Sequence, residues 1–333
     1  MSARKVPLPD SEREDVKTAA QRDGCEPMLA VLTEDRFSDP DWLYERKLDG
    51  ERLLALRDQD RVRLMTRNRK EVSATYPELA EAIACQPARD FVVDGEVVAF
   101  DGAVTSFSRL QQRMQIRDAE KARASGVRVY LYLFDLLRVS GRNIEAMPLR
   151  ERKRLLRETI GFDDPLRYTP HRNENGEACY RTACEKGWEG IIAKRADAPY
   201  HHGRSRDWLK FKCSSGQEFV IGGFTRPQGE REGFGALLLG YYEDGALRYA
   251  GKVGTGFDDA FLQDFRKRLD RRRRDSSPFE LTPDEADALW VRPDLVAEIG
   301  FTEWTQGGKL RHPRFLGLRR DKAAEEVVRE TPS

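Results

Sequence analysis

Long apolar runs are absent from this chain of 333 residues. None approaches the ~20 residues that a helix needs to cross a bilayer. The start of the chain, MSARKVPLPDSERED, also lacks the apolar core of a secretory signal. These absences exclude a membrane-spanning helix and a secreted precursor of the usual kind, so we expect a cytoplasmic protein.

The sequence is also poor in the side chains that bind zinc. It has five cysteines and four histidines. The cysteines are odd in number and scattered, at Cys25, Cys85, Cys179, Cys184 and Cys213. Cys179 and Cys184 are the closest pair, and neither a second pair nor a histidine cluster completes a zinc site. This pattern predicts free thiols in a reducing compartment.

An excess of charge of one sign is missing too. The chain has 58 basic and 57 acidic residues and a net charge of +1. Simple attraction to a polyanion therefore cannot be the whole basis of binding, although the two signs can segregate on different surfaces. The run Arg271 to Arg274, preceded by Arg266, Lys267 and Arg268, is either a binding patch or the solvated face of a helix.

Length and composition indicate a folded protein of two domains, with 39% hydrophobic and 35% charged residues. We expect a polar tail over residues 1–23, a first domain over 24–213, a second over 217–322 and a tail over 323–333. The first domain is predicted to contain strands at 42–48, 52–58, 61–67, 91–101, 127–137, 188–195 and 208–212, with helices at 77–84 and 148–160. The alternation in 52–58 predicts a strand buried on one face.

The second domain has a different pattern, with glycine-punctuated strands at short spacing from residue 217 onward. This pattern predicts a small antiparallel barrel, interrupted by one helix at 258–273. The predicted fold class is therefore α+β.

Charged side chains interrupt the strongest apolar strands. Asp94 and Glu96 lie between pairs of valines, and Glu189 precedes Gly190-Ile-Ile. Lys210 and Lys212 are two apart on one predicted strand and therefore point to the same face. Together with Lys47, Asp49 and Lys194 they could line one cleft. For any single pair, an exposed position or a structural salt bridge is the better explanation, but the whole set in this order favours a site.

These charged residues belong to short motifs in a fixed order. The motifs are Lys47 to Arg52 (KLDGER), Thr66 to Asn68 (TRN), Phe91 to Glu96 (FVVDGE), Leu133 to Leu137 (LFDLL), Glu189 to Lys194 (EGIIAK), Trp208 to Lys212 (WLKFK) and Arg311 to Lys322 (RHPRFLGLRRDK). Over residues 27–322 the chain resembles an ATP-dependent DNA ligase of the covalent nucleotidyltransferase superfamily. Within it, the chain most resembles the ligase module of bacterial non-homologous end-joining proteins.

The resemblance implies a fold and a set of site residues. The fold is an adenylyltransferase domain, ATP-grasp-like and built of antiparallel sheets, followed by a C-terminal OB-fold barrel. Lys47 would be the nucleophile, assisted by Lys210 and Lys212, and a lysine attacks only as the neutral amine, so we expect its pKa to be lowered. The implied nucleotide-binding residues are Glu45, Lys47, Arg52, Arg67, Glu96, Phe134, Glu189, Lys194, Lys210 and Lys212.

Other implied roles concern the metal and the second domain. Glu96 and Glu189 would hold Mg²⁺ or Mn²⁺, and Phe134 would stack on adenine unless it is an ordinary core aromatic. A lid on the OB domain would consist of Arg311, Arg314, Arg319, Asp321 and Lys322, a segment that is otherwise a basic C-terminal tail.

The implied substrates are ATP and nicked or broken double-stranded DNA, handled by a monomer in the bacterial cytoplasm or nucleoid, with no membrane involved. The protein either needs a partner such as Ku or acts alone. Three alternatives remain: an RNA ligase, a capping guanylyltransferase that uses GTP, and a nucleic-acid-binding module without catalysis. The presence of Lys47 argues against the last.

Overall fold

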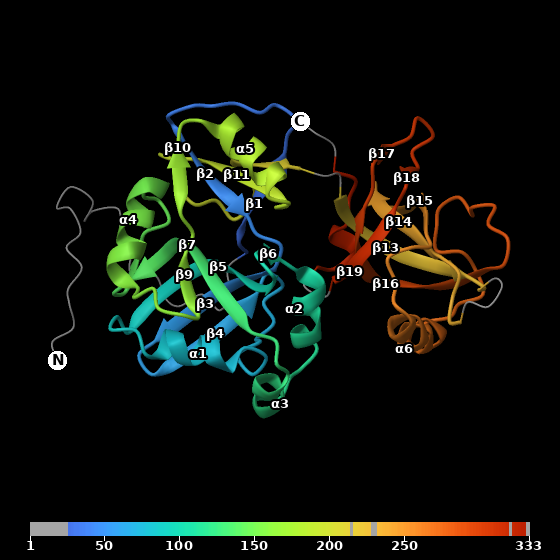
Figure 1. Ribbon diagram of the computed structural model, residues 1–333, viewed down its shortest axis with the longest axis horizontal. Helices are drawn as coiled ribbons and strands as arrows, with labels where there is room; N and C mark the ends of the chain where they lie inside the picture. Colours follow the sequence, from blue (N-terminus) through green and yellow to red (C-terminus); the bar gives the residue numbers. More distant parts are fainter. Residues whose placement is uncertain (1–25, 214–215, 228–231, 320–321, 331–333) are drawn as a thin grey trace. The chain divides into compact units, whose positions relative to one another are not determined.

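The computed structural model describes residues 26–213, 216–227, 232–319 and 322–330. The chain divides into two compact units, the first ending at Cys213 and the second beginning at Ser214 (Figure 1). The polar tail predicted over 1–23 lies outside the described residues. Within the described ranges, no helix is long and apolar enough to span a membrane.

The first unit contains two sheets. The larger has seven strands, with β4 (Arg61–Thr66), β3 (Glu51–Asp58), β5 (Asp90–Asp101), β7 (Val129–Val139) and β8 (Arg142–Asn143) in that order, β6 (Val104–Thr105) on β5 and β9 (Leu166–Tyr168) on β7. The smaller has the order β1 (Met28–Leu32), β12 (Gly203–Lys212), β11 (Gly190–Arg195), β2 (Trp42–Lys47) and β10 (His171–Asn173). All neighbours pair antiparallel except β1 with β12 and β7 with β9.

The larger sheet is covered on both faces. Leu53 and Ala55 of β3 belong to one apolar cluster, whereas Leu54 and Leu56 belong to another that includes Trp208 of the smaller sheet. Successive residues of a strand point to opposite faces, so β3 is buried on both sides. The prediction of a strand buried on one face was therefore wrong. The second cluster is where the two sheets meet.

Five helices of the first unit are described: α1 (Pro77–Ala84), α2 (Phe107–Met114), α3 (Ala119–Ala124), α4 (Leu149–Thr159) and α5 (Gly176–Glu185). Figure 1 shows α1 beside β3 and β4, and α5 beside β2 and β11. α4 packs on β7, and its buried residues Leu149, Leu155 and Leu156 follow helical spacing. The helix predicted at 148–160 is thus present with nearly the same ends.

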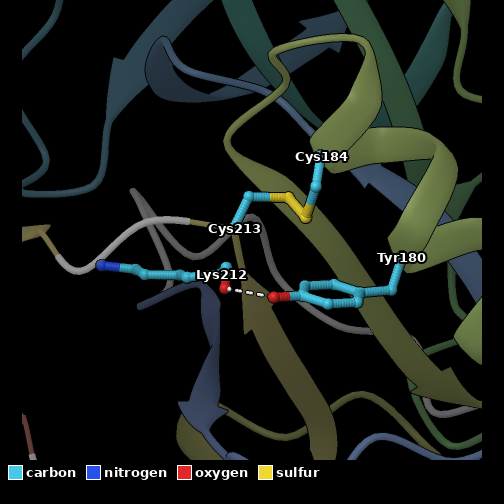
Figure 2. The surroundings of a disulfide bond; sticks show 4 residues. All are labelled: Tyr180, Cys184, Lys212 and Cys213. Atoms are coloured by element: carbon cyan, nitrogen blue, oxygen red, sulfur yellow. Dashed lines mark hydrogen bonds between the residues drawn. A yellow bond between two sulfur atoms is a disulfide. The ribbon is translucent and has the colours of Figure 1, made fainter.

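A disulfide between Cys184 and Cys213 joins the end of α5 to the residue that follows β12 (Figure 2). Cys85 and Cys179 are free, and Cys25 lies outside the described residues. The prediction of free thiols was therefore wrong for Cys184 and Cys213. The fold brings these two residues together although 29 positions separate them in the sequence.

The second unit is a small antiparallel β domain of the OB-fold type. Its sheet has the order β15 (Ala246–Val253), β14 (Leu237–Glu243), β13 (Gly216–Thr225), β16 (Ala288–Gly300) and β19 (Arg314–Arg319), and β17 (Glu303–Trp304) pairs with β18 (Leu310–Arg311). The helix α6 (Asp259–Asp270) buries Leu262, Phe265 and Leu269 against the apolar core of this unit.

Two predictions for the second unit need correction. The helix expected at 258–273 ends at Asp270, so Arg272 to Arg274 lie beyond it, where Arg272 pairs with Asp294 at 2.7 Å. The tail expected from residue 323 onward is not a tail over its described part. Ala324, at the start of a 3₁₀ helix (Ala324–Glu326), and Val327 are buried in the core because their small apolar side chains cover the sheet.

A buried ion pair connects α4 to β7 in the first unit. Arg152 and Asp135 are fully buried, and two hydrogen bonds of 2.8 and 2.9 Å join the guanidinium to the carboxylate. The same guanidinium donates to the carbonyls of Met147 and Ala198. Removing one partner of such a pair leaves an uncompensated charge in the interior.

We predict that Arg152→Met lowers the free energy of unfolding by ~3–5 kcal/mol, because the Asp135 carboxylate stays buried without its partner. Urea unfolding measures the change. Arg154→Met is the control, because Arg154 lies on the same helix with its side chain 42% exposed; its loss should stay below ~1 kcal/mol. Equal losses in both variants would contradict the conclusion that Arg152 compensates a buried charge.

Candidate functional site

The register of the smaller sheet gathers charged side chains on one face. Gly190 of β11 pairs with Lys47 of β2 on one side and with Lys212 of β12 on the other. Two residues further along β11, Ile192 lies opposite Glu45 and Lys210. Residues two apart on a strand share a face, so Glu45, Lys47, Lys210 and Lys212 all point to the same side. The structure therefore brings together four of the residues expected from the motifs.

Gly190 is required at the centre of this row. Its φ of +147° lies in the region that favours glycine, and a Cβ at this position would collide with the carbonyl oxygen of Phe211. Gly190 therefore adds no side chain to this face between Lys47 and Lys212.

The amine of Lys47 lies 2.6 Å from the carboxylate of Glu189, and both side chains are partly exposed, at 20% and 24%. Burial lowers the pKa of Lys47 and so does Lys212, but the carboxylates of Glu189 and Glu96 outweigh them and raise the pKa above its usual value. The expectation of a lowered pKa was wrong for this state, because the nearest charge to the amine is negative.

The pKa of Glu189 is shifted in the opposite direction, by the lysines around it. Burial raises the pKa of the carboxyl, but the charges of Lys47, Lys212 and Lys210 hold it below its usual value. Glu189 is therefore ionised at neutral pH, and it lies where a cationic ligand or a metal would compete with Lys47 for it.

Glu96 is the other carboxylate expected at a metal. It lies on β5 opposite Arg52 of β3, and its charge reaches Lys47. Among the described residues there is no group of three or more His, Cys, Asp or Glu side chains that could hold a metal ion. Two carboxylates still suit Mg²⁺, which keeps several waters and takes its remaining ligands from substrate phosphates.

Glu45 lies at the centre of a buried charge cluster. Its side chain is 2% exposed, with one carboxylate oxygen 2.5 Å from the amine of Lys153 and the other 2.7 Å from that of Lys194. Burial raises the pKa of Glu45, and the two lysines more than reverse the effect, so the pKa is lowered. Lys153 also lies 3.3 Å from the carbonyls of Phe134 and Thr169.

Lys153 was not expected from the motifs. The signal that could have found it is its position four residues after Leu149 on α4, which places it on the buried face of that helix. A lysine on the inner face of an amphipathic helix needs a buried partner, and Glu45 is that partner.

Lys194 also contacts aromatic rings. Its amine lies 3.9 Å from the ring centroid of Phe134 and 4.0 Å from that of Trp208. Burial, followed by the positive charge of Lys153, lowers its pKa to about 8 although Glu45 opposes the shift. Phe134 itself is 7% exposed and packs edge-on against Trp208. The two rings and Glu45 thus surround one lysine whose pKa is held below its usual value.

Arg52 is held by a second network. Two of its nitrogens lie 2.5 and 2.6 Å from the carboxylate of Asp94, which also accepts a hydrogen bond of 2.7 Å from Tyr200. The guanidinium carbon lies 4.6 Å from the centroid of Phe134. Arg67, the other expected arginine, directly follows Thr66, which pairs with Leu53 next to Arg52. The strand register therefore brings both arginines to the same end of the sheet.

The expected lid residues all belong to the second unit, where those that are described take different positions. Arg319 and Lys322 are largely buried and lie 3.8 Å from Glu298 and 3.0 Å from Glu218. These two glutamates face each other across β13 and β16. Arg311 is exposed and pairs with Glu303 at 2.6 Å, and Arg314 is exposed at the start of β19. Asp321 lies outside the described residues.

Comparison with protein families agrees with this geometry. The model of the ATP dependent DNA ligase domain matches residues 27–212, and that of the ATP dependent DNA ligase C terminal region matches residues 230–322. The multifunctional non-homologous end joining protein LigD of Pseudomonas aeruginosa is 39% identical over 316 residues, which are 92% of this chain and 37% of that protein.

A second LigD protein and a solved structure are also similar to this chain. The LigD protein of Mycobacterium tuberculosis is 37% identical over 315 residues, 92% of this chain and 40% of that protein. The chain thus spans about two fifths of the length of these LigD proteins. A solved structure described as mycobacterial DNA ligase D complexed with ATP and MES is 35% identical, with a TM-score of 0.67, over 93% of this chain and 100% of that one.

The first family model covers almost the whole first unit, including both sheets and every residue around Lys47. The second covers most of the OB-fold-type unit. On these grounds the chain belongs to the family of ATP-dependent DNA ligases.

Proposed function

We propose that the chain seals breaks in double-stranded DNA that carry a 3′-hydroxyl and a 5′-phosphate, through an AMP group carried on Lys47. The observation that supports this most is the position of the Lys47 amine, 2.6 Å from Glu189 and on one face with Lys210 and Lys212. A partly exposed amine among further cations suits attack on a polyphosphate, where negative charge must be stabilised.

In the first step, the neutral amine of Lys47 attacks the α-phosphorus of ATP. A phosphorus–nitrogen bond forms, the bond to the bridging oxygen of the β-phosphate breaks, and pyrophosphate leaves. The AMP group then moves to the 5′-phosphate of DNA and frees Lys47. In the last step the adjacent 3′-hydroxyl attacks that phosphate and releases AMP.

The charged residues around Lys47 have different roles in the first step. Lys210 and Lys212 stabilise the non-bridging oxygens, and Lys212 also lowers the pKa of Lys47. Glu96 and Glu189 would hold Mg²⁺ or Mn²⁺, which supplies positive charge to the phosphates when bound. While Glu189 pairs with Lys47 it keeps the amine protonated, so this contact has to be given up before attack.

The buried cluster is proposed to bind the base and sugar. Glu45 accepts a hydrogen bond from the adenine amino group, and Phe134 offers its ring to the base beside Lys194. Arg52 and Arg67 bind the ribose and the phosphate of a DNA end. In the second unit, Arg311, Arg314, Arg319, Asp321 and Lys322 orient the leaving pyrophosphate.

The cellular setting is proposed from the relatives. Proteins named for non-homologous end joining share 37–39% identity with this chain, so we propose that it repairs DNA breaks as a monomer in the bacterial cytoplasm or nucleoid, with Ku as a partner. DNA would be held mainly through its phosphates.

We predict that Lys47→Ala abolishes self-adenylylation and sealing of an ordinary nick but spares part of the sealing of a nick already carrying AMP, because the last step does not need the amine. Gel assays with both substrates measure this. Lys121→Ala, at an exposed position of α3, is the control and should leave both reactions unchanged. Complete loss with both substrates would show that Lys47 is needed for the fold instead.

We predict that the rate of self-adenylylation rises with pH through the neutral range and on into the alkaline range, because Glu189 raises the pKa of Lys47 above its usual value and only the neutral amine attacks. In Glu189→Gln the maximal rate falls, but the pH midpoint moves to lower values, because the anion that retains the proton is gone. Single-turnover rates across pH measure the midpoint. Glu185→Gln, exposed on α5, should keep the wild-type midpoint, and an unmoved midpoint in Glu189→Gln would contradict the coupling.

We predict that Lys153→Met raises the KM for ATP by roughly tenfold with a smaller change in kcat, because Glu45 loses the contact that fixes one of its oxygens. Steady-state adenylylation at varied ATP measures both constants. Arg154→Met, on the exposed side of the same helix, should change neither. An unaltered KM would show that Lys153 does not position Glu45.

A further inference from the structure

The disulfide lies directly beside the proposed nucleotide site. Cys213 follows Lys212 in the chain, and its backbone N–H donates a hydrogen bond of 3.0 Å to the carbonyl of Glu189. In Figure 2 the carbonyl of Lys212 faces α5, where it accepts a 3.2 Å hydrogen bond from Tyr180, while the Lys212 side chain extends away from that helix. One covalent bond thus adjoins the two residues that face Lys47.

We propose that Cys184 and Cys213 form a reversible thiol–disulfide site, and that the bond fixes the end of β12 in the position that adenylylation of Lys47 requires. The second half of this inference rests on the proposed function, whereas the first half does not. The co-reactant is a soluble thiol–disulfide couple.

The chemistry of the site needs only such a couple. Both cysteines are partly exposed. In oxidation, the thiolate of one cysteine attacks a disulfide of the couple, forms a mixed disulfide and releases one thiol. The second cysteine then attacks that mixed disulfide, so the Cys184–Cys213 bond forms and the other thiol leaves. The protein loses two electrons and two protons, which the couple gains, and a dithiol reverses the reaction.

The bond acts at the point where the β11–β12 ladder ends. Lys212 and Gly190 form the last pair of the β11–β12 ladder, and beyond it Cys213 keeps one backbone hydrogen bond to Glu189. On the other side, α5 packs against β11 and β2 through a cluster that includes Ala183 and Ile191. Oxidation therefore adds a covalent link between the strand end and a packed helix. Reduction leaves the strand end to its hydrogen bonds and to the packing of Phe211 and Cys213, and contacts at the end of a strand open more readily than those at its centre.

Reduction is expected to affect Lys212 and Glu189 together. Lys212 directly precedes Cys213, and the backbone N–H of Cys213 donates a hydrogen bond to the carbonyl of Glu189. A displaced Lys212 stabilises the phosphate oxygens less well, and small displacements in a site of this kind have large effects on rate. The sheet itself keeps its ladder in both states. We therefore expect the oxidised protein to adenylylate faster than the reduced protein, with little change in overall fold.

The test uses a variant of the full chain with Cys25, Cys85 and Cys179 replaced by serine, so that only the proposed pair remains. The variant is equilibrated in buffers of reduced and oxidised dithiothreitol. Alkylation followed by intact mass counts the thiols, and single-turnover adenylylation with ATP and Mg²⁺ gives the rate for each state. Cys184→Ser and Cys213→Ser in the same background cannot form the bond.

We expect both thiols to disappear together as one two-electron couple, and the rate to fall by roughly three- to tenfold on reduction. Cys184→Ser and Cys213→Ser should show the lower rate in every buffer, whereas Cys85→Ser alone, at an exposed free cysteine, should respond as the wild type does. Two thiols that stay reactive under oxidising conditions would overturn the site. Equal rates in both states would overturn its effect on Lys212.

Failure of the proposed function gives a different result. In that case no adduct forms in either state, while the thiol count still shows whether the bond forms reversibly.

Discussion

The pairing of three strands at Lys47, Gly190 and Lys212 is the constraint on which the rest of the site depends. The two lysines share one face, and the central residue adds no side chain between them. Only glycine fits at position 190, because its φ is +147° and a Cβ would collide with the backbone oxygen of Phe211. Glu189, the residue before it, then lies within 2.6 Å of the Lys47 amine. A single register thus places the proposed nucleophile, its carboxylate partner and the lysine proposed to bind phosphate.

The charged residues of the site fall into two sets that differ in burial. Lys153, Lys194 and Glu45 are almost completely buried and satisfy one another, and Arg52 is paired with the fully buried Asp94. Buried charges are tolerated only when paired in good geometry, so these side chains have little freedom to move. Lys47 and Glu189 remain partly exposed. The buried pairs are therefore held in place, whereas the Lys47–Glu189 pair, which is proposed to separate during the reaction, is partly exposed.

Much of this site could be predicted from the sequence, because charged residues in several strand motifs of one fixed order are a strong signal together, although each alone is weak. Lys47, Glu189 and Lys212 were found in this way. Lys153 was missed because charged residues on helices are normally solvated, and its burial depends on a partner in a distant strand. The Cys184–Cys213 bond could not be inferred, since cysteine spacing does not determine pairing. The direction of the Lys47 pKa shift also depends on a distance, 2.6 Å to Glu189, that only the fold sets.

The central claim is that Lys47 is the residue that carries AMP. Its most direct test is to incubate the protein with Mg²⁺ and either ATP or GTP, then to measure the intact mass and map any adduct by peptide sequencing. The account predicts one AMP group from ATP, acid-labile and located on the peptide that contains Lys47, and no adduct from GTP. An adduct on another residue, or protein that carries no AMP before or after incubation with ATP, would contradict it.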